Sequence, residues 1–129
     1  MSQENVEIVR SYLWAFENDT DSFREITHPD IEWAPFEADH TPSYGVAGAM
    51  GIRNGWLDAW EEHRIDIEEI FDRGDEVLAA IRLTARGRGS GVEVGVPLYL
   101  HVKVRDGKVA YVFEHQDRAA ALTAVGLEE

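Results

Sequence analysis

The sequence predicts an α+β domain in which a curved antiparallel β-sheet wraps around an N-terminal helical hairpin and a third helix, with an internal pocket at the open end of the resulting cone. Three observations lead to this fold class. Residues 1–60 carry apolar side chains mostly at helical spacing. The second half alternates polar and apolar residues over four long runs. Glycine-containing turns at 73–75, 89–91 and 106–107 separate these runs.

The N-terminal helix is predicted by apolar residues that recur every three or four positions, at Val6, Val9, Leu13 and Phe16. The polar cluster at 18–21 ends this helix near Glu17 and caps a second, short helix through Phe23 and Ile26. Pro29 stops the second helix, because the residue before a proline is pushed out of the helical region. The two helices therefore form a helical hairpin.

Residues 30–34 alternate and predict a short strand, and residues 35–48 predict a long irregular loop. Long loops in compact domains are often functional. A third helix from about Ala47 follows from the spacing of Ile52, Trp56 and Trp60, although Gly51 and Gly55 each cost it about 1 kcal/mol relative to alanine.

Four strands at about 64–73, 75–88, 92–105 and 108–116 predict an antiparallel meander. A turn centred on Ser90 and Gly91 would place Arg88 opposite Glu93, Arg82 opposite Tyr99 and Ala80 opposite His101. A last helix is predicted at 118–125, with Asp117 as its N-cap and Gly126 at its end.

Length and composition exclude several classes of protein. A chain of 129 residues without a linker predicts one domain spanning 1–129. Its net charge of −13 repels phosphate backbones, so we expect no nucleic-acid partner. No apolar run is long enough to cross a membrane, and the absence of cysteine fits a cytoplasmic location. The histidines lack metal-ligand spacing, so no metal site is expected.

Several short motifs resemble the SnoaL-like branch of the nuclear transport factor two-like superfamily, which also contains ketosteroid isomerases, limonene-epoxide hydrolases and polyketide cyclases. They cover essentially the whole chain: N-V-E-I-V-R (5–10), P-D-I-E-W (29–33), Y-G-V-A-G (44–48), G-R-G-S-G-V-E-V (87–94), R-D-G-K-V (105–109) and D-R-A-A-A-L-T-A-V-G-L (117–127). The resemblance implies the cone fold with a small-molecule pocket. It does not fix the chemistry, since this superfamily contains both enzymes and non-catalytic domains.

The resemblance also implies which family residues are present. The general-base aspartate of ketosteroid isomerases falls on Ala34, and their oxyanion tyrosine falls on Leu13, so steroid isomerisation by that route is not supported. Polyketide cyclases place a histidine and an acid at positions matching His101 and Asp117, with His115 as a competitor for the second place. The epoxide-hydrolase set would need Arg82, Asp117 and a second carboxylate such as Asp39.

Histidine suits acid/base chemistry because its ordinary pKa is about 6.5. We therefore expect His101 to be the acid/base, oriented by Tyr99 or Arg82, with Asp117 or His115 as the second group. The alternatives are that His101 is a core histidine with satisfied hydrogen bonds and that Asp117 is only an N-cap. The residues expected to line the pocket are mainly aromatic: Tyr12, Trp14, Trp33, Phe36, Tyr44, Trp56, Trp60, Arg82, Tyr99 and Phe113.

These features predict a small-molecule-binding domain that performs acid/base chemistry without a cofactor on a compact, apolar, carbonyl-like compound. The alternative is a non-catalytic ligand-binding or accessory domain. A homodimer is expected, because one sheet face would line the pocket while the other, strongly apolar face needs another cover: Val94, Val96, Leu98, Leu100, Val102 and Val104.

Overall fold

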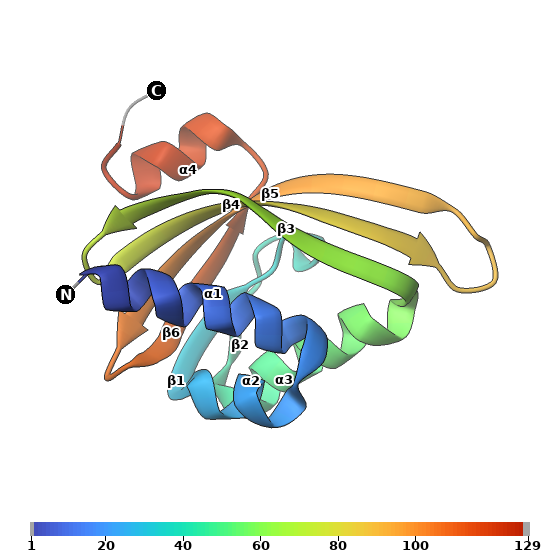
Figure 1. Cartoon of the computed structure of the whole chain (residues 1–129), viewed down its shortest axis with the longest axis horizontal. Helices are drawn as coiled ribbons and strands as arrows, with labels where there is room; N and C mark the ends of the chain where they lie inside the picture. Colours follow the sequence, from blue (N-terminus) through green and yellow to red (C-terminus); the bar gives the residue numbers. More distant parts are fainter. Residues whose placement is uncertain (1, 128–129) are drawn as a thin grey trace.

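The computed structural model describes residues 2–127 and has helices on both faces of one six-stranded sheet (Figure 1). Helices α1 (Ser2–Asn18) and α2 (Thr20–Ile26) form the predicted hairpin, and α3 (Gly45–Ala59) is the predicted third helix. A single 3-10 turn, η1 (Phe36–Ala38), interrupts the loop before α3. The last helix, α4 (Arg118–Ala124), is capped by the Asp117 side chain, as predicted.

The strands follow the order β2-β1-β6-β5-β4-β3, with bounds β1 (Thr27–Ala34), β2 (Ser43–Tyr44), β3 (Trp60–Arg73), β4 (Glu76–Gly87), β5 (Glu93–Arg105) and β6 (Lys108–His115). Strands β3 to β6 form the predicted antiparallel meander. β1 adds to it by pairing in parallel with β6, which makes the sheet mixed. No local turn signals this pairing, because the connection between the two strands contains most of the domain.

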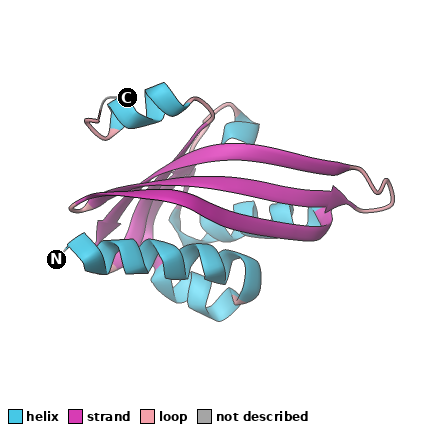
Figure 2. Ribbon diagram, turned by 45° about the horizontal axis from the view of Figure 1, so that its top comes forward, coloured by secondary structure: helices cyan, strands magenta, loops and turns pink. Residues whose placement is uncertain are grey.

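Helices cover both faces of the sheet, to different extents (Figures 1 and 2). Helices α1, α2 and α3 lie on the inner face and α4 lies on the outer face. Strand alternation assigns side chains to them, so Leu98, Leu100 and Val102 of β5 face inward while Tyr99 and His101 face outward. The α+β cone is confirmed.

The β4–β5 register differs from the prediction by two residues. His101 pairs with Leu78, Tyr99 with Ala80, and Pro97 with Arg82. The predicted pairs of Arg82 with Tyr99, Ala80 with His101 and Arg88 with Glu93 are therefore wrong. The cause is a four-residue turn at 88–91, closed by a 2.9 Å hydrogen bond from Gly87 N to Val92 O, with Gly89 and Gly91 in the left-handed region.

The apolar face of β5 is part of the core and is not an outer surface. Its residues from Leu98 to Val104 on the even-numbered side are at most 9% exposed and pack with α1 residues such as Val9 and Phe16. Helix α1 thus covers the face that we expected a second copy to cover. The reason is that the helical hairpin must bury its own apolar side, and the more apolar face of the sheet provides the surface.

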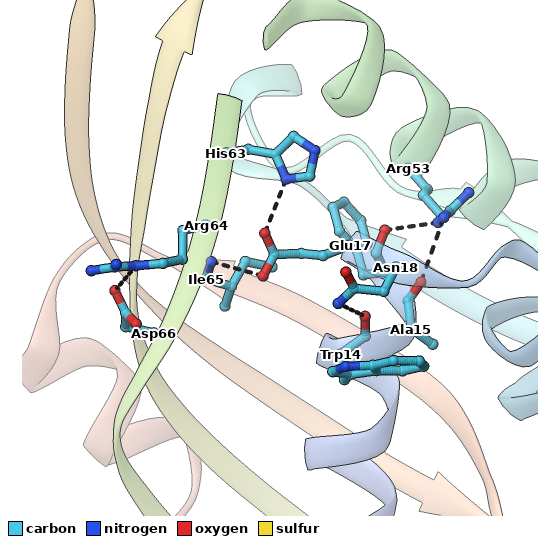
Figure 3. Close-up of polar contacts among 10 residues, drawn as sticks. Trp14, Ala15, Glu17, Asn18, Arg53, His63, Arg64, Ile65 and Asp66 are labelled. Carbon is cyan, nitrogen blue, oxygen red and sulfur yellow. Dashed lines mark hydrogen bonds and ion pairs between the residues drawn. The ribbon is translucent and has the colours of Figure 1, made fainter. Parts of the chain in front are cut away.

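The C-terminal end of α1 is fastened to α3 and β3 by two charged side chains (Figure 3). Arg53 is only 4% exposed, and it donates from Nε to Phe16 O at 2.8 Å and from Nη1 to Thr20 Oγ1 at 2.9 Å. A cation is favourable there because the last carbonyls of a helix lack partners. Glu17 accepts from Ile65 N through one oxygen and pairs with His63 Nδ1 through the other, both at 2.9 Å.

We expect Arg53→Met to lower the free energy of unfolding by about 1–3 kcal/mol, because it leaves the carbonyl of Phe16 without a donor, whereas the carbonyl of Ala15 keeps its bond from Asp19 N. Urea denaturation would measure this. The matched control is Arg64→Met, since the Arg64 side chain is 73% exposed and its loss should change stability by less than about 0.5 kcal/mol. Equal effects of the two changes would contradict a role of Arg53 in fastening α1.

Candidate functional site

A cavity of about 50 Å³ lies between the inner face of the sheet and the helices. By this measure one water molecule needs about 10–15 Å³, so the cavity holds a few waters or a very small organic group. Its wall is almost wholly apolar and aromatic, with two carboxyl groups: Leu13, Phe16, Trp33, Phe36, Glu37, Ile52, Trp56, Ile65, Ile81, Leu83, Leu98, Leu100 and Glu114.

Glu114 is the buried carboxyl of this wall. It lies on β6 two residues after the buried Val112, so strand alternation turns both side chains inward. Its residue is 7% exposed, whereas Glu37 on η1 is exposed. Glu114 Oε2 accepts a hydrogen bond from Trp33 Nε1 at 2.6 Å, and Oε1 accepts one from Phe36 N at 3.2 Å. The carboxyl group is thereby held at a fixed place on the cavity wall.

Burial raises the pKa of Glu114 above its ordinary value, since removal from water disfavours the charged form. The hydrogen bonds from Trp33 and Phe36 oppose this shift without cancelling it. A carboxyl group with a raised pKa exchanges its proton closer to neutral pH than an exposed one. This property suits a general acid or base.

The loop after β1 builds the wall beside Glu114. Asp39 and His40 have φ values of 51° and 61°, so two consecutive residues other than glycine adopt the left-handed conformation. Two contacts of His40 hold this turn: its ring stacks on Phe113 with centroids 4.4 Å apart, and its Nε2 lies 2.6 Å from the backbone carbonyl of Glu114. Because a carbonyl only accepts, Nε2 carries the proton. The segment predicted as a functional loop is thus an ordered part of the wall.

Three of the predicted pocket residues line the cavity, namely Trp33, Phe36 and Trp56. The other four aromatic residues of the N-terminal half lie elsewhere. Tyr12 is buried in the core, stacked on Phe23 and hydrogen-bonded to Thr27 Oγ1 at 2.8 Å, and Trp60 lines a groove beside the cavity. Trp14 and Tyr44 are 57% and 65% exposed, because each lies on the solvent side of its element.

The site residues predicted on β4, β5 and β6 lie on the outer face, away from the cavity: Arg82, Tyr99, His101, Phe113 and His115. This placement corrects our assignment of the sheet faces. Tyr99 packs against the α4 cluster, and His101 is 6% exposed with its Nε2 2.7 Å from Glu76 Oε1. The alternative in which His101 is a core histidine with satisfied hydrogen bonds matches this geometry.

The structure brings His101 and His115 together, with ring centroids 6.5 Å apart, but it does so on the outer face. Burial, followed by the proximity of His101, lowers the pKa of His115. Asp117 accepts a hydrogen bond from Ala120 N at 3.0 Å, which is the N-cap alternative. None of the three predicted acid/base residues is on the cavity wall.

Our sequence analysis missed Glu114. The sequence does carry one signal, since Glu114 is a single carboxylate on the same face of its strand as the apolar Val112. We assigned that face to the outside of the sheet, because the opposite face carries Tyr111, Phe113 and His115, which looked more suited to a functional site.

Within residues 2–127, no helix is long and apolar enough to cross a lipid bilayer. In the same residues, no three histidine, aspartate or glutamate side chains are grouped as they would be to hold a metal ion.

The sequence matches the model of the SnoaL-like domain over residues 9–112. The chain belongs to the SnoaL-like domain family. This confirms the resemblance drawn from the short motifs, and the match spans the cavity wall from Leu13 to Leu100. No functionally curated protein matches the chain.

Solved structures with the same fold are similar over nearly their whole length. A putative SnoaL-like polyketide cyclase from Jannaschia has a TM-score of 0.77 at 21% identity, covering 98% of this chain and 94% of its own. AclR, a putative hydroxylase from Streptomyces galilaeus, has a TM-score of 0.76 at 19% identity, covering 98% of both chains. A protein with the ketosteroid isomerase-like fold from Catenulispora acidiphila has a TM-score of 0.75 at 16% identity, covering 94% and 93%. At these identities the comparison concerns the fold.

The raised pKa of Glu114 predicts how stability depends on pH. The folded protein binds this proton more tightly than the unfolded chain, so the contribution of Glu114 is fully present below the ordinary pKa of 4.5 and is lost as pH rises through the folded value. We therefore expect the wild type to lose stability relative to Glu114→Gln as pH rises from about 4.5. Urea denaturation of both proteins over a pH series measures the difference.

The control for this prediction is Glu25→Gln, which changes an exposed carboxylate on α2 outside the cavity wall. Its stability should run parallel to that of the wild type over the same pH range. A constant difference between wild type and Glu114→Gln at every pH would contradict the raised pKa.

Proposed function

We propose that this SnoaL-like domain binds a compact, largely apolar molecule in the cavity and moves a proton on it through Glu114. The observation that carries the proposal is the buried carboxyl of Glu114 on an otherwise apolar and aromatic wall. A charge-bearing group is costly at such a place, and perturbed groups of this kind concentrate at functional sites.

The reaction class that fits is proton transfer at carbon beside a carbonyl group. Glu114 as carboxylate takes a proton from that carbon; the C–H electron pair forms the new C=C bond and the carbonyl π electrons move to oxygen. Returning the proton to the same or another carbon restores the carboxylate, so no oxidant or reductant is consumed. Because its pKa is raised, Glu114 is a stronger base than an exposed carboxylate, and its pKa lies closer to that of the C–H group. Proton transfer from carbon is therefore less unfavourable.

Two structural neighbours support a small-molecule role for this pocket. The Catenulispora protein was crystallised with trimethylamine, and TerC, with a TM-score of 0.75 at 20% identity, was co-crystallised with polyporic acid. The small cavity of the present chain favours a compact ligand such as the first of these in size.

Hydrogen–deuterium exchange at carbon tests the proton-transfer proposal. Protein in D2O is incubated with cyclopentanone or 2-butanone, and loss of the α-proton signals is followed by NMR. We expect the wild type to speed the exchange and Glu114→Gln to lower that rate by about 100-fold or more, since general acid–base groups contribute at least this much. His101→Phe is the control and should keep the wild-type rate, because His101 lies on the outer face of the sheet. Exchange that is equally fast with Glu114→Gln would overturn the role of Glu114.

The second candidate is a binding domain without chemistry. One observation favours it: apart from Glu114 and Glu37, the indole N–H groups of Trp33 and Trp56 are the only side-chain polar groups among the described residues of the cavity wall, and Trp33 already donates to Glu114. A thermal shift or NMR perturbation by the ketones without deuterium exchange supports this second candidate.

We also propose that the outer face mediates a homodimer. Tyr111, Phe113 and His115 form a half-buried aromatic surface on β6, of which α4 covers little and His40 covers one part by stacking on Phe113. A homodimer would remove this surface from water.

Mass in solution tests the dimer. We expect twice the mass of the 14.6 kDa chain by sedimentation at micromolar concentration, and a monomer for Phe113→Glu, which places a charge on that surface. Trp14→Glu, which changes an exposed aromatic residue on α1, is the control and should leave the dimer intact. A monomeric wild type would retire the proposal.

A further inference from the structure

A groove lies directly beside the cavity, between η1 and α3. Its volume is about 280 Å³, against about 50 Å³ for the cavity. The two hollows share the side chains of Glu37, Ile52 and Trp56, so these three residues form a partition between them. Ligand sites usually measure about 300–1,000 Å³. The volume of the cavity alone is far below that range. The cavity and the groove together reach its lower end.

Two donors at this groove have no acceptor. The indole nitrogens of Trp56 and Trp60 are both buried, and neither has a hydrogen-bond partner within residues 2–127. Their rings lie 5.2 Å apart at 54°, and both residues line the groove. A buried donor without a partner is unfavourable by about 1–3 kcal/mol, so a turn of either ring that brought its N–H group to a ligand oxygen would remove this cost.

The groove is also open where α3 faces it. A Cβ added at Gly51 or Gly55 would meet no atom within 4 Å. Glycine there is not required by packing within the chain, and it weakens the helix by about 1 kcal/mol at each position. The space above these glycines is therefore available to a bound molecule.

We infer that the groove is the second half of the ligand site, and that it takes a neutral, hydrogen-bond-accepting carbonyl group of a molecule whose apolar end enters the cavity. The inference rests on the proposed function, because it extends the same site. The accepting oxygen lies at the indole N–H groups of Trp56 and Trp60, which must turn to expose them. We expect a neutral ligand, because the Glu37 carboxylate at the partition and the net charge of −13 disfavour an anionic group.

Three probes separate the two halves of the site. Dissolved propane is small enough to occupy the cavity of about 50 Å³ alone. 2-Hexanone is longer and carries a ketone, and hexane has the same chain with CH2 in place of the carbonyl. Binding is followed in ¹⁵N–¹H spectra, where the four tryptophan indole signals are separate from the amide signals. Trp33 reports on the cavity, because its N–H donates to Glu114, and Trp60 reports on the groove.

We expect 2-hexanone to shift the indole signals of Trp33 and Trp60, and to bind about fivefold more tightly than hexane through the added hydrogen bond. Trp60→Phe keeps a ring but removes one of the two donors, and it should lower this preference without changing propane binding. Gly55→Leu fills the groove and should weaken 2-hexanone about tenfold while leaving propane unchanged. Asn54→Leu is the matched control, since Asn54 is exposed on α3 outside the groove.

The outcomes distinguish the two proposals. If propane shifts Trp33 but the preference for 2-hexanone over hexane is absent, or is undiminished in Trp60→Phe, the groove inference fails and the cavity stands. If Gly55→Leu and Asn54→Leu weaken 2-hexanone equally, the groove inference also fails. If none of the probes shifts Trp33, the proposed binding function and the groove inference both fail.

Discussion

The structure depends on how α1 is held across the inner face of the sheet. Burial of Val9 and Phe16 against β4 and β5 holds α1 on the sheet, but such an apolar contact does not fix the position of the helix along it. That position is fixed at the C-terminal end of α1, where Arg53 donates to two carbonyls of the helix and Glu17 accepts from β3. If the helix were free to slide, the cavity wall that Leu13 and Phe16 provide would not have a fixed shape.

The order of elements could be predicted because each has a local cause. Helical spacing, Pro29, the Asp-Gly turn at 106–107 and the Asp117 cap act within a few residues, and all are visible in the sequence. Two features could not be predicted. The parallel pairing of β1 with β6 depends on the path of the whole chain between them. The two-residue change in the β4–β5 register depends on the shape of a glycine-rich turn.

The candidate site was harder to predict than the fold, for a physical reason. Period-2 alternation divides a strand into two faces, but it does not say which of them faces the helices. On β5 and β6 we gave the pocket to the face with imidazole and phenol groups, and the structure gives it to the face with leucine, valine and one glutamate. Trp33, Phe36 and Trp56, which we also assigned to the pocket, lie on β1, η1 and α3 and line the cavity.

The sheet has one long open edge, because β3 has a partner on one side only and runs for 14 residues. An edge of this length is a template on which a strand of another molecule can add. Charged side chains occupy much of it, including Glu61, Glu62, Arg64, Glu68 and Glu69, all of them exposed. A strand that added to this edge would remove these charges and their ion pairs from water, which is unfavourable. The charged side chains of β3 thus disfavour aggregation along this edge of the domain.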